Sequence, residues 1–190
     1  MAEDSRVTTV RLTILTGAPG SGKTAILNAL RGDIRCYDEP ARQILAEQRA
    51  SGGDGTPEQN AAKFVDLLLQ RSIANHADPR LHGGPVLFDR GVPDCIAYAQ
   101  ILGTDPMPSA QAAAVHRYHP VALVTKPWEE IYTTDDERKM TFDHALEFQR
   151  WIELLYEASG YTLVEVPRSS IEQRAAFVRG FLAKAAPQST

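Results

Sequence analysis

The sequence lacks the features that mark several classes of protein. It has two cysteines in 190 residues, Cys36 and Cys95, and they form no CxxC pair. A chain of this length does not depend on disulfides for a stable core, so we interpret both as reduced thiols of a cytoplasmic protein. No run of about 18 apolar residues is present, and residues 1–9 lack the apolar segment of a signal peptide. We therefore expect no membrane span and no secretory signal.

A basic surplus is also missing. The chain carries 20 Lys and Arg residues against 24 Asp and Glu residues, which gives a net charge of −4 at pH 7. Proteins that hold a nucleic-acid backbone neutralise it with clustered lysine and arginine, so we expect no nucleic-acid partner. An acidic protein that binds a small polyanion needs a local basic pocket and a metal ion.

Short apolar runs alternate with helical patterns along the chain, without an internal repeat. The predicted strands are 10–16, 34–37, 86–89, 121–125 and 162–166. The predicted helices are 23–30, 41–49, 57–75, 93–102, 110–118, 142–158 and 171–184. Thr56, Pro57 and Gln59 are expected to form a capping box at the start of the third helix. The alternation predicts an α/β fold with a parallel sheet covered on both faces.

We expect residues 10–186 to form one domain, between a flexible N-terminus (1–9) and a short tail (187–190). In a parallel sheet, ligands bind beyond the carboxyl ends of the strands. The segments that directly follow each predicted strand are therefore the places to look for chemistry.

The segment GAPGSGKT, residues 17–24, follows the first strand and opens a helix, as the phosphate-binding pattern G-x-x-x-x-G-K-[ST] requires. Its glycines let successive backbone N–H groups point at phosphate oxygens, and the helix N-terminus adds partial positive charge. We expect Lys23 to reach the β- and γ-phosphates and Thr24 to bind Mg²⁺ through its hydroxyl. The expected nucleotide contacts come from Gly17, Pro19, Gly20, Ser21, Gly22, Lys23, Thr24 and Ala25. The motif does not say whether the phosphate is transferred, hydrolysed or sensed.

The second strand ends in YDEPAR, which places Asp38 and Glu39 at the sheet edge and Arg42 in the next helix. One interpretation is a helix start enriched in acids, which the helix dipole favours. The other is functional: either carboxylate could accept a proton from a substrate hydroxyl or help hold Mg²⁺, and Arg42 could bind an anionic substrate group.

The third strand ends in FDRGVPD. Asp89 stands where a phosphate-loop protein keeps the carboxylate of its metal site, although it could instead cap the following helix. Arg90 could hold a phosphate or a substrate carboxylate with two hydrogen bonds. Asp94 is a candidate substrate contact and, equally, an acid at a helix start.

A charged stretch, residues 127–141, follows the fourth strand and contains Arg138 and Lys139. It could be a solvated loop. It could also be a lid that closes over the nucleotide, brings Arg138 and Lys139 to the transferring phosphate and excludes water.

Other phosphate-loop proteins fit the sequence less well. A guanine-nucleotide switch carries [NT]-K-x-D after the fourth strand, but Trp128 stands in place of that Asp, and Val92 replaces the Gly of D-x-x-G. A hydrolytic motor would carry a Glu after Asp89, where this chain has Arg90. A small-molecule kinase needs the phosphate loop, an acid after the second strand, an Asp-Arg pair after the third and an arginine-bearing lid. All four occur in that order.

The segments GAPGSGKT, YDEPAR, FDRGVPDCIAYA and DDERKMTFDHALEFQ together resemble the AAA-type P-loop ATPase-domain family related to the kinase domain of bacterial ribosylnicotinamide kinase. The resemblance runs from about Arg11 to Val166. The same segments are similar, more distantly, to deoxynucleoside and thymidylate kinases, which usually carry Ser or an aromatic residue where this chain has Gly91.

The resemblance implies a P-loop NTPase fold, a three-layer α/β/α sandwich whose five strands are ordered 2-3-1-4-5. It also implies Glu39 or Asp38 as the base, Arg90 as the clamp for phosphate or substrate, and Arg138 as the lid arginine. We therefore expect a kinase that transfers the γ-phosphoryl of ATP, with Mg²⁺ on Thr24 and Asp89, to a hydroxyl of a nucleoside-like or other small metabolite. The alternative is a nucleotide-dependent binding or regulatory protein that uses ATP or GTP with slow or no hydrolysis.

Overall fold

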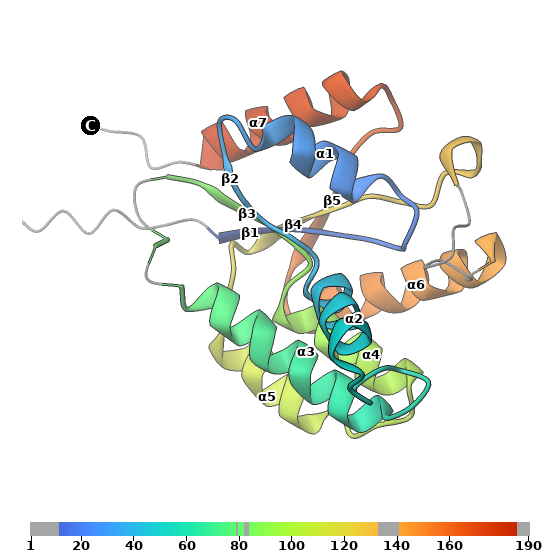
Figure 1. The fold of residues 1–190 in the computed structure, drawn as a ribbon. Coiled ribbons are helices and arrows are strands. Elements are labelled where there is room, and N and C mark those ends of the chain that lie inside the picture. The colour runs from blue at the N-terminus through green and yellow to red at the C-terminus, as the bar shows by residue number, and fades with distance from the viewer. Residues whose placement is uncertain (1–11, 79, 82–83, 133–140, 186–190) are drawn as a thin grey trace, which may run out of the picture.

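The computed structural model describes residues 12–78, 80–81, 84–132 and 141–185 (Figure 1). Its centre is a five-stranded sheet in the order β2-β3-β1-β4-β5, and every neighbouring pair is parallel. The strands are β1 (Leu12–Thr16), β2 (Arg35–Tyr37), β3 (Val86–Asp89), β4 (Val121–Val124) and β5 (Thr162–Glu165). The predicted fold class and strand order 2-3-1-4-5 are confirmed.

Helices cover both faces of this sheet. They are α1 (Lys23–Leu30), α2 (Pro40–Ser51), α3 (Ala61–His76), α4 (Val92–Ile101), α5 (Met107–Val115), α6 (Phe142–Ala158) and α7 (Ile171–Ala185), with a short 3-10 helix, η1, at Glu129–Ile131. Helices α1 and α7 lie on one face, and α2 to α6 lie on the other (Figure 1). The result is the three-layer arrangement that the alternating pattern indicates.

The two core layers follow from the alternation of side chains along each strand. Leu15 packs with the core under α1 and α7, while its neighbour Ile14 packs with the core on the opposite face. In β3, Leu87 likewise packs with the core under α1 and α7, and Phe88 packs with the core on the opposite face. Strands that are buried on both faces read as continuous apolar runs, and this explains why β1 and β3 could be located from sequence.

Two helices differ from the prediction by three residues or more at one or both ends. Helix α3 begins at Ala61 rather than residue 57, because the side chain of Asn60 caps it by accepting a hydrogen bond from the Lys63 backbone N–H (3.2 Å). The predicted helix start at Thr56 is therefore wrong. Thr56 lies in a preceding turn, where its hydroxyl accepts from the Gln59 N–H (3.3 Å), the one bond of the predicted capping box that the described residues form. Helix α5 begins at Met107 and ends at Val115, earlier at both ends than the predicted range 110–118.

The early start of α5 has a simple cause, because Pro108 in its first turn has no N–H that the helix would need to pair. The predicted flexible terminus (1–9), tail (187–190) and most of the predicted lid (127–141) lie outside the described residues. In the part of the chain that is described, none of the helices combines the length and apolar character needed to cross a bilayer.

Candidate functional site

The phosphate loop, residues 17–24, joins β1 to α1 at the edge where the carboxyl ends of the strands meet. Gly17 has a φ of 132°, and a Cβ there would lie 2.0 Å from the carbonyl oxygen of Thr125. Gly22 has a φ of 85°, and a Cβ there would lie 2.5 Å from Nη1 of Arg174. Both positions require a residue without a side chain, so the shape of the loop depends on the glycines of the motif.

Side chains from distant elements hold this loop from outside. Gln149 of α6 accepts a hydrogen bond from the Ala18 N–H (2.8 Å), and Arg174 of α7 donates through Nη2 to the Ser21 carbonyl (2.7 Å). The Ser21 hydroxyl donates to the Ala18 carbonyl and also shares a hydrogen bond with the Thr125 hydroxyl, both at 2.7 Å. These contacts fix the backbone that would face a phosphate group.

Gln149 and Arg174 were not predicted as site residues, although the sequence contains a signal for each. Both are polar residues on the buried faces of amphipathic helices, and their exposures are only 4% and 3%. A buried polar side chain needs a hydrogen-bonding partner. Such a residue on an otherwise apolar face therefore indicates a contact across the fold.

Lys23 is buried within the loop that carries it. Its Nζ donates to the carbonyl oxygens of Gly17 (2.9 Å) and Ala18 (3.0 Å). Burial lowers the pKa of Lys23 to about 8, with a further contribution from the positive charge of Arg90. The carboxylates of Asp89 and Glu39 act in the opposite direction. The lysine is thus placed among the charged groups predicted at the strand ends.

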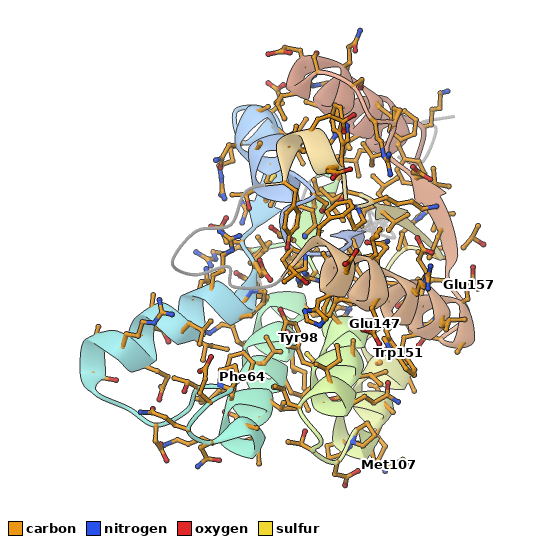
Figure 2. All side chains as sticks on the ribbon, turned by 90° about the vertical axis from the view of Figure 1, so that its right-hand side faces the viewer. Phe64, Tyr98, Met107, Glu147, Trp151 and Glu157 are labelled. Atoms are coloured by element: carbon orange, nitrogen blue, oxygen red, sulfur yellow. The ribbon has the colours of Figure 1, made fainter. Side chains whose placement is uncertain are left out.

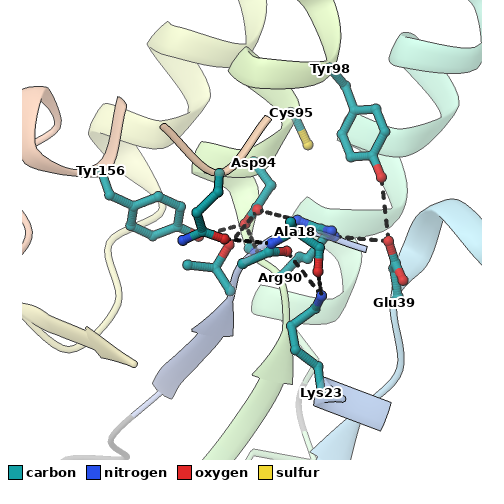
Figure 3. A network of polar contacts seen from close by, with 12 residues as sticks. Ala18, Lys23, Glu39, Arg90, Asp94, Cys95, Tyr98 and Tyr156 are labelled. Carbon is teal, nitrogen blue, oxygen red and sulfur yellow. Dashed lines mark hydrogen bonds and ion pairs between the residues drawn. The ribbon is translucent and has the colours of Figure 1, made fainter. Parts of the chain in front are cut away.

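Arg90 connects the second and third strand ends (Figure 3). Its Nε donates to Glu39 Oε1 (2.8 Å) and its Nη1 donates to Asp94 Oδ1 (3.0 Å). Its backbone adopts a φ of 70°, which is uncommon for a residue other than glycine, and its N–H donates to the Leu15 carbonyl (3.1 Å). The fold thus holds this arginine in a strained conformation that directs its side chain between two carboxylates.

Glu39 and Asp38 were left as alternatives by the sequence, and the structure separates them. Asp38 pairs with Arg31, 48% of its side chain is exposed, and it does not line the cavity over the phosphate loop. Glu39 lines the cavity over the phosphate loop, accepts from Arg90 and Tyr98 through Oε1, and accepts from Arg42 through Oε2 (3.1 Å). Of the two carboxylates, Glu39 is therefore the one in the candidate site.

The protonation state of Glu39 is set by opposing effects. Burial acts to raise its pKa, but the charges of Arg90, Lys23 and Arg42 outweigh burial and lower the pKa to about 2. Glu39 is consequently ionised at neutral pH and available as a hydrogen-bond acceptor.

Asp94 accepts hydrogen bonds on both carboxylate oxygens from within the protein. Oδ1 accepts from the Thr16 hydroxyl (2.7 Å) as well as from Arg90, and Oδ2 accepts from the Gly91 N–H (2.8 Å) and the Tyr156 hydroxyl. Its exposure is 2%. This geometry favours the helix-start alternative over a substrate contact, and it gives Asp94 the task of orienting Arg90.

Asp89, at the end of β3, is buried with an exposure of 2%, and its Oδ1 has no hydrogen-bond partner among the described residues. Burial raises the pKa of this carboxyl group to about 6, against the effect of the nearby Lys23. A buried carboxylate oxygen without a partner is suited to an added cation or to water bound to one. The residues present therefore fit the magnesium site predicted at Thr24 and Asp89.

No cluster of three or more His, Cys, Asp or Glu side chains that could hold a metal occurs within the described residues. This is compatible with Mg²⁺, which is usually bound by one or two protein groups together with phosphate oxygens and water. A site of this kind does not need a cage of protein ligands.

Two cavities border these groups. A cavity of about 380 Å³ lies over the phosphate loop, and its walls include Lys23, Thr24, Glu39, Arg42 and Ile171. The side chain of Ile131, the last residue of η1, and the ring of the following Tyr132 lie against Gly22 and Gly20, respectively, at its edge. The predicted lid therefore begins in contact with the loop, but Arg138 falls outside the described residues.

The second cavity, of about 810 Å³, lies between α4 and α6. Ile101, Phe148 and Trp151 give it an apolar wall, with Glu147 beside them; Figure 2 shows Glu147 and Trp151 on α6. Phe148 links this cavity to the charged site, because the Arg90 guanidinium lies 5.4 Å from the centre of its ring. The volume is within the range of pockets that bind small molecules.

Several solved structures share this fold at low sequence identity. A NadR protein in complex with NR matches 95% of the chain with a TM-score of 0.68 and 16% identity, and the chain spans 54% of that protein. A deoxyadenosine kinase from M. mycoides with bound dATP matches 91% of the chain and 99% of its own length, with a TM-score of 0.63 and 10% identity.

Shikimate kinase from Acinetobacter baumannii in complex with shikimate matches 95% of the chain and 97% of its own length, with a TM-score of 0.53 and 16% identity. No curated protein sequence matches the chain. The fold is thus a P-loop NTPase fold that resembles those of small-molecule kinases, and the loop implies nucleotide binding. The family model described as the AAA domain matches residues 12–174, and the protein therefore belongs to this family of P-loop domains.

Proposed function

We propose that the protein is an ATP-dependent phosphotransferase that moves the γ-phosphoryl group of Mg-ATP to a hydroxyl of a nucleoside-like or other small metabolite. The observation that carries the proposal is the position of Glu39. This ionised carboxylate lines the cavity over the phosphate loop and is held there by Arg90, Arg42 and Tyr98. A carboxylate at this position can accept a hydrogen bond from an acceptor hydroxyl next to the phosphate site, as transfer to a small molecule requires.

The phosphate loop and Lys23 bind the nucleotide in this scheme. The Nζ of Lys23, which donates to two loop carbonyls in the structure, is a donor at the phosphate cavity and binds the β- and γ-phosphates. Backbone N–H groups at the start of α1 bind further phosphate oxygens. Positioning of the two substrates and positive charge around the phosphates make the main contribution to the rate of transfer. The transition state of phosphoryl transfer is loose and needs little covalent assistance.

Thr24 and Asp89 are the residues that would hold Mg²⁺, through a hydroxyl and through a carboxylate oxygen without another partner. The metal supplies positive charge that offsets the charge of the phosphates. Burial raises the pKa of Asp89 to about 6, and a bound cation would favour its ionised form.

Glu39 orients the acceptor hydroxyl and accepts its proton. A carboxylate whose pKa is lowered to about 2 is a weak base, so the hydrogen bond that orients the acceptor is its larger contribution. Arg90 holds Glu39 in place, and Arg42, at the rim of the same cavity, is placed to bind an anionic group. The lid arginine, Arg138, remains a prediction from sequence.

The proposal predicts that ADP is formed faster when the right acceptor is present. The protein should be incubated with Mg-ATP and with separate pools of nucleosides, sugars and other hydroxyl-bearing metabolites, and ADP release should be followed for each pool. At least one pool is expected to raise the rate well above the background hydrolysis. Equal, slow ADP release with every pool, or selective stabilisation by GTP, would instead favour a nucleotide-dependent binding protein.

Replacing Lys23 by alanine is expected to remove the nucleotide-dependent increase in thermal stability while the protein without nucleotide remains folded. A ligand at a hundredfold its dissociation constant stabilises a folded protein by about 2.7 kcal/mol, and Lys23 supplies the side-chain charge at the phosphates. Melting curves with and without Mg-ADP measure the effect. Unfolding of the variant in the absence of nucleotide would show that the bonds from Lys23 to Gly17 and Ala18 are primarily structural.

A further inference from the structure

Arg174, on the first turns of α7, is a buried cation in contact with the phosphate loop. Its exposure is 3%, and its Nη2 donates to the Ser21 carbonyl at 2.7 Å. Its Nη1 occupies the space where a side chain on Gly22 would lie. Ile171, one turn earlier on the same helix, lines the cavity over the loop. The arginine therefore lies directly behind the backbone that forms the phosphate site.

The charge of Arg174 is not balanced within the described part of the protein. Its Nε and Nη1 have no hydrogen-bond partner there, and burial lowers its pKa without an opposing contribution from a carboxylate. The other buried arginine of the site, Arg90, has two carboxylate partners, Glu39 and Asp94. Since an arginine stays protonated in proteins, Arg174 is a buried positive charge without a negative partner among the residues that the structure describes.

Burying an unpaired charge is costly, and the cost is recovered only if an opposite charge is brought close. A nucleotide bound at the loop brings several negative charges to the cavity lined by Gly22, Lys23 and Thr24. Arg174 is not among the residues that line this cavity and contacts the loop at the Ser21 carbonyl, so its attraction to the phosphates needs no direct contact. In a region of low dielectric constant, such an attraction is much stronger than in water.

We infer that Arg174 is a positioning residue of the nucleotide site, which holds the loop through Ser21 and contributes a positive charge from behind it that favours bound polyphosphate. Its contribution to affinity should therefore increase with the number of phosphates, from AMP to ADP to ATP. The inference rests on nucleotide binding by the loop. It does not depend on phosphoryl transfer, so it can fail or succeed independently of the proposed kinase activity.

The test compares Arg174→Met with the wild-type protein and with Arg179→Met. Methionine keeps much of the buried volume but removes the charge, and Arg179 is a matched control on the same helix, paired with Asp33 and 45% exposed at its side chain. Isothermal titration with AMP, ADP and ATP in the presence of Mg²⁺ gives the dissociation constants. Thermal melting of each protein without nucleotide gives its stability.

Arg174→Met is expected to weaken ATP binding by at least about tenfold and AMP binding much less, with a melting temperature that is unchanged or higher without nucleotide. Arg179→Met should leave all three affinities unchanged. Unchanged ATP affinity, or an equal loss for the three nucleotides together with a lower melting temperature, would overturn the inference and leave Arg174 with a structural role only.

Arg174→Lys makes the test independent of whether the methionine variant folds. Lysine keeps the positive charge but cannot reproduce the planar donor geometry of the guanidinium. If charge is what matters, the dissociation constant for ATP should stay within about threefold of the wild-type value. A tenfold or larger loss of ATP affinity in a folded lysine variant would contradict the inference.

Discussion

Replacing Glu39 by glutamine is expected to lower the turnover rate by a factor on the order of 10², the lower end of the usual contribution of a positioned acid or base, because Glu39 acts mainly by orienting the acceptor hydroxyl. The amide has nearly the same shape as the carboxylate but carries no negative charge and accepts a proton poorly. It would weaken both the orientation of the acceptor hydroxyl and the ion pair with Arg90. The measurement is steady-state kinetics with an acceptor identified from the metabolite pools.

The neighbouring residue provides the control for this experiment. Asp38→Asn changes the same type of group at the end of the same strand, but Asp38 is exposed, is paired with Arg31 and does not line the cavity over the phosphate loop. It should leave turnover within about twofold of the wild-type rate, as expected for an exposed ion pair. ADP binding should be close to normal in both variants. Equal losses of turnover in the two variants would contradict the assignment of Glu39 to the acceptor.

Much of the fold could be predicted because its signals are local and redundant. The phosphate loop has required glycines, a strand before it and a helix after it, and β3 was located without error at Val86–Asp89. The phosphate loop and β3 can each be recognised from residues that are adjacent in the sequence. The strand order could not come from such local patterns, and it followed instead from the resemblance to known kinases.

The parts of the site that escaped prediction depend on contacts between distant segments. Asp38 and Glu39 are adjacent acids, and sequence alone could not show which one faces the loop. Gln149 holds the loop at Ala18, which is 131 positions away in the sequence, and Arg174 holds it at Ser21, which is 153 positions away. The choice between the two acids depends on Arg90 and Tyr98, and the contacts of Gln149 and Arg174 depend on how α6 and α7 pack. A motif contains neither kind of information.

Arg90 explains why the candidate site combines functional and structural residues. One end of its guanidinium group meets Glu39, which faces the cavity, and the other meets Asp94, which is enclosed by Thr16, Gly91 and Tyr156. Asp94 is thus an anchor, and Glu39 is held at a fixed position relative to the phosphate loop. A hydroxyl that binds to Glu39 would be oriented by the same network that stabilises the sheet edge.

Replacing Asp94 by alanine should therefore have a large effect on stability. The substitution removes the acceptor for four buried donors and leaves the buried Arg90 with a single carboxylate. Breaking a buried ion pair by removal of one partner costs about 3–5 kcal/mol, a large part of the roughly 5–15 kcal/mol that keeps a domain folded. The free energy of unfolding, measured by urea denaturation, checks this value.

Asp105→Ala is the matched comparison, because Asp105 also accepts a backbone N–H near a helix start, from Met107 at 2.9 Å, but is exposed. Loss of such a helix-start contact costs about 1 kcal/mol. The difference between the two variants separates the burial of Asp94 from its role at the start of α4. If both variants lost the same small stability, Asp94 would not be an anchor, and the position of Arg90 would have to come from Glu39 and the strained backbone alone.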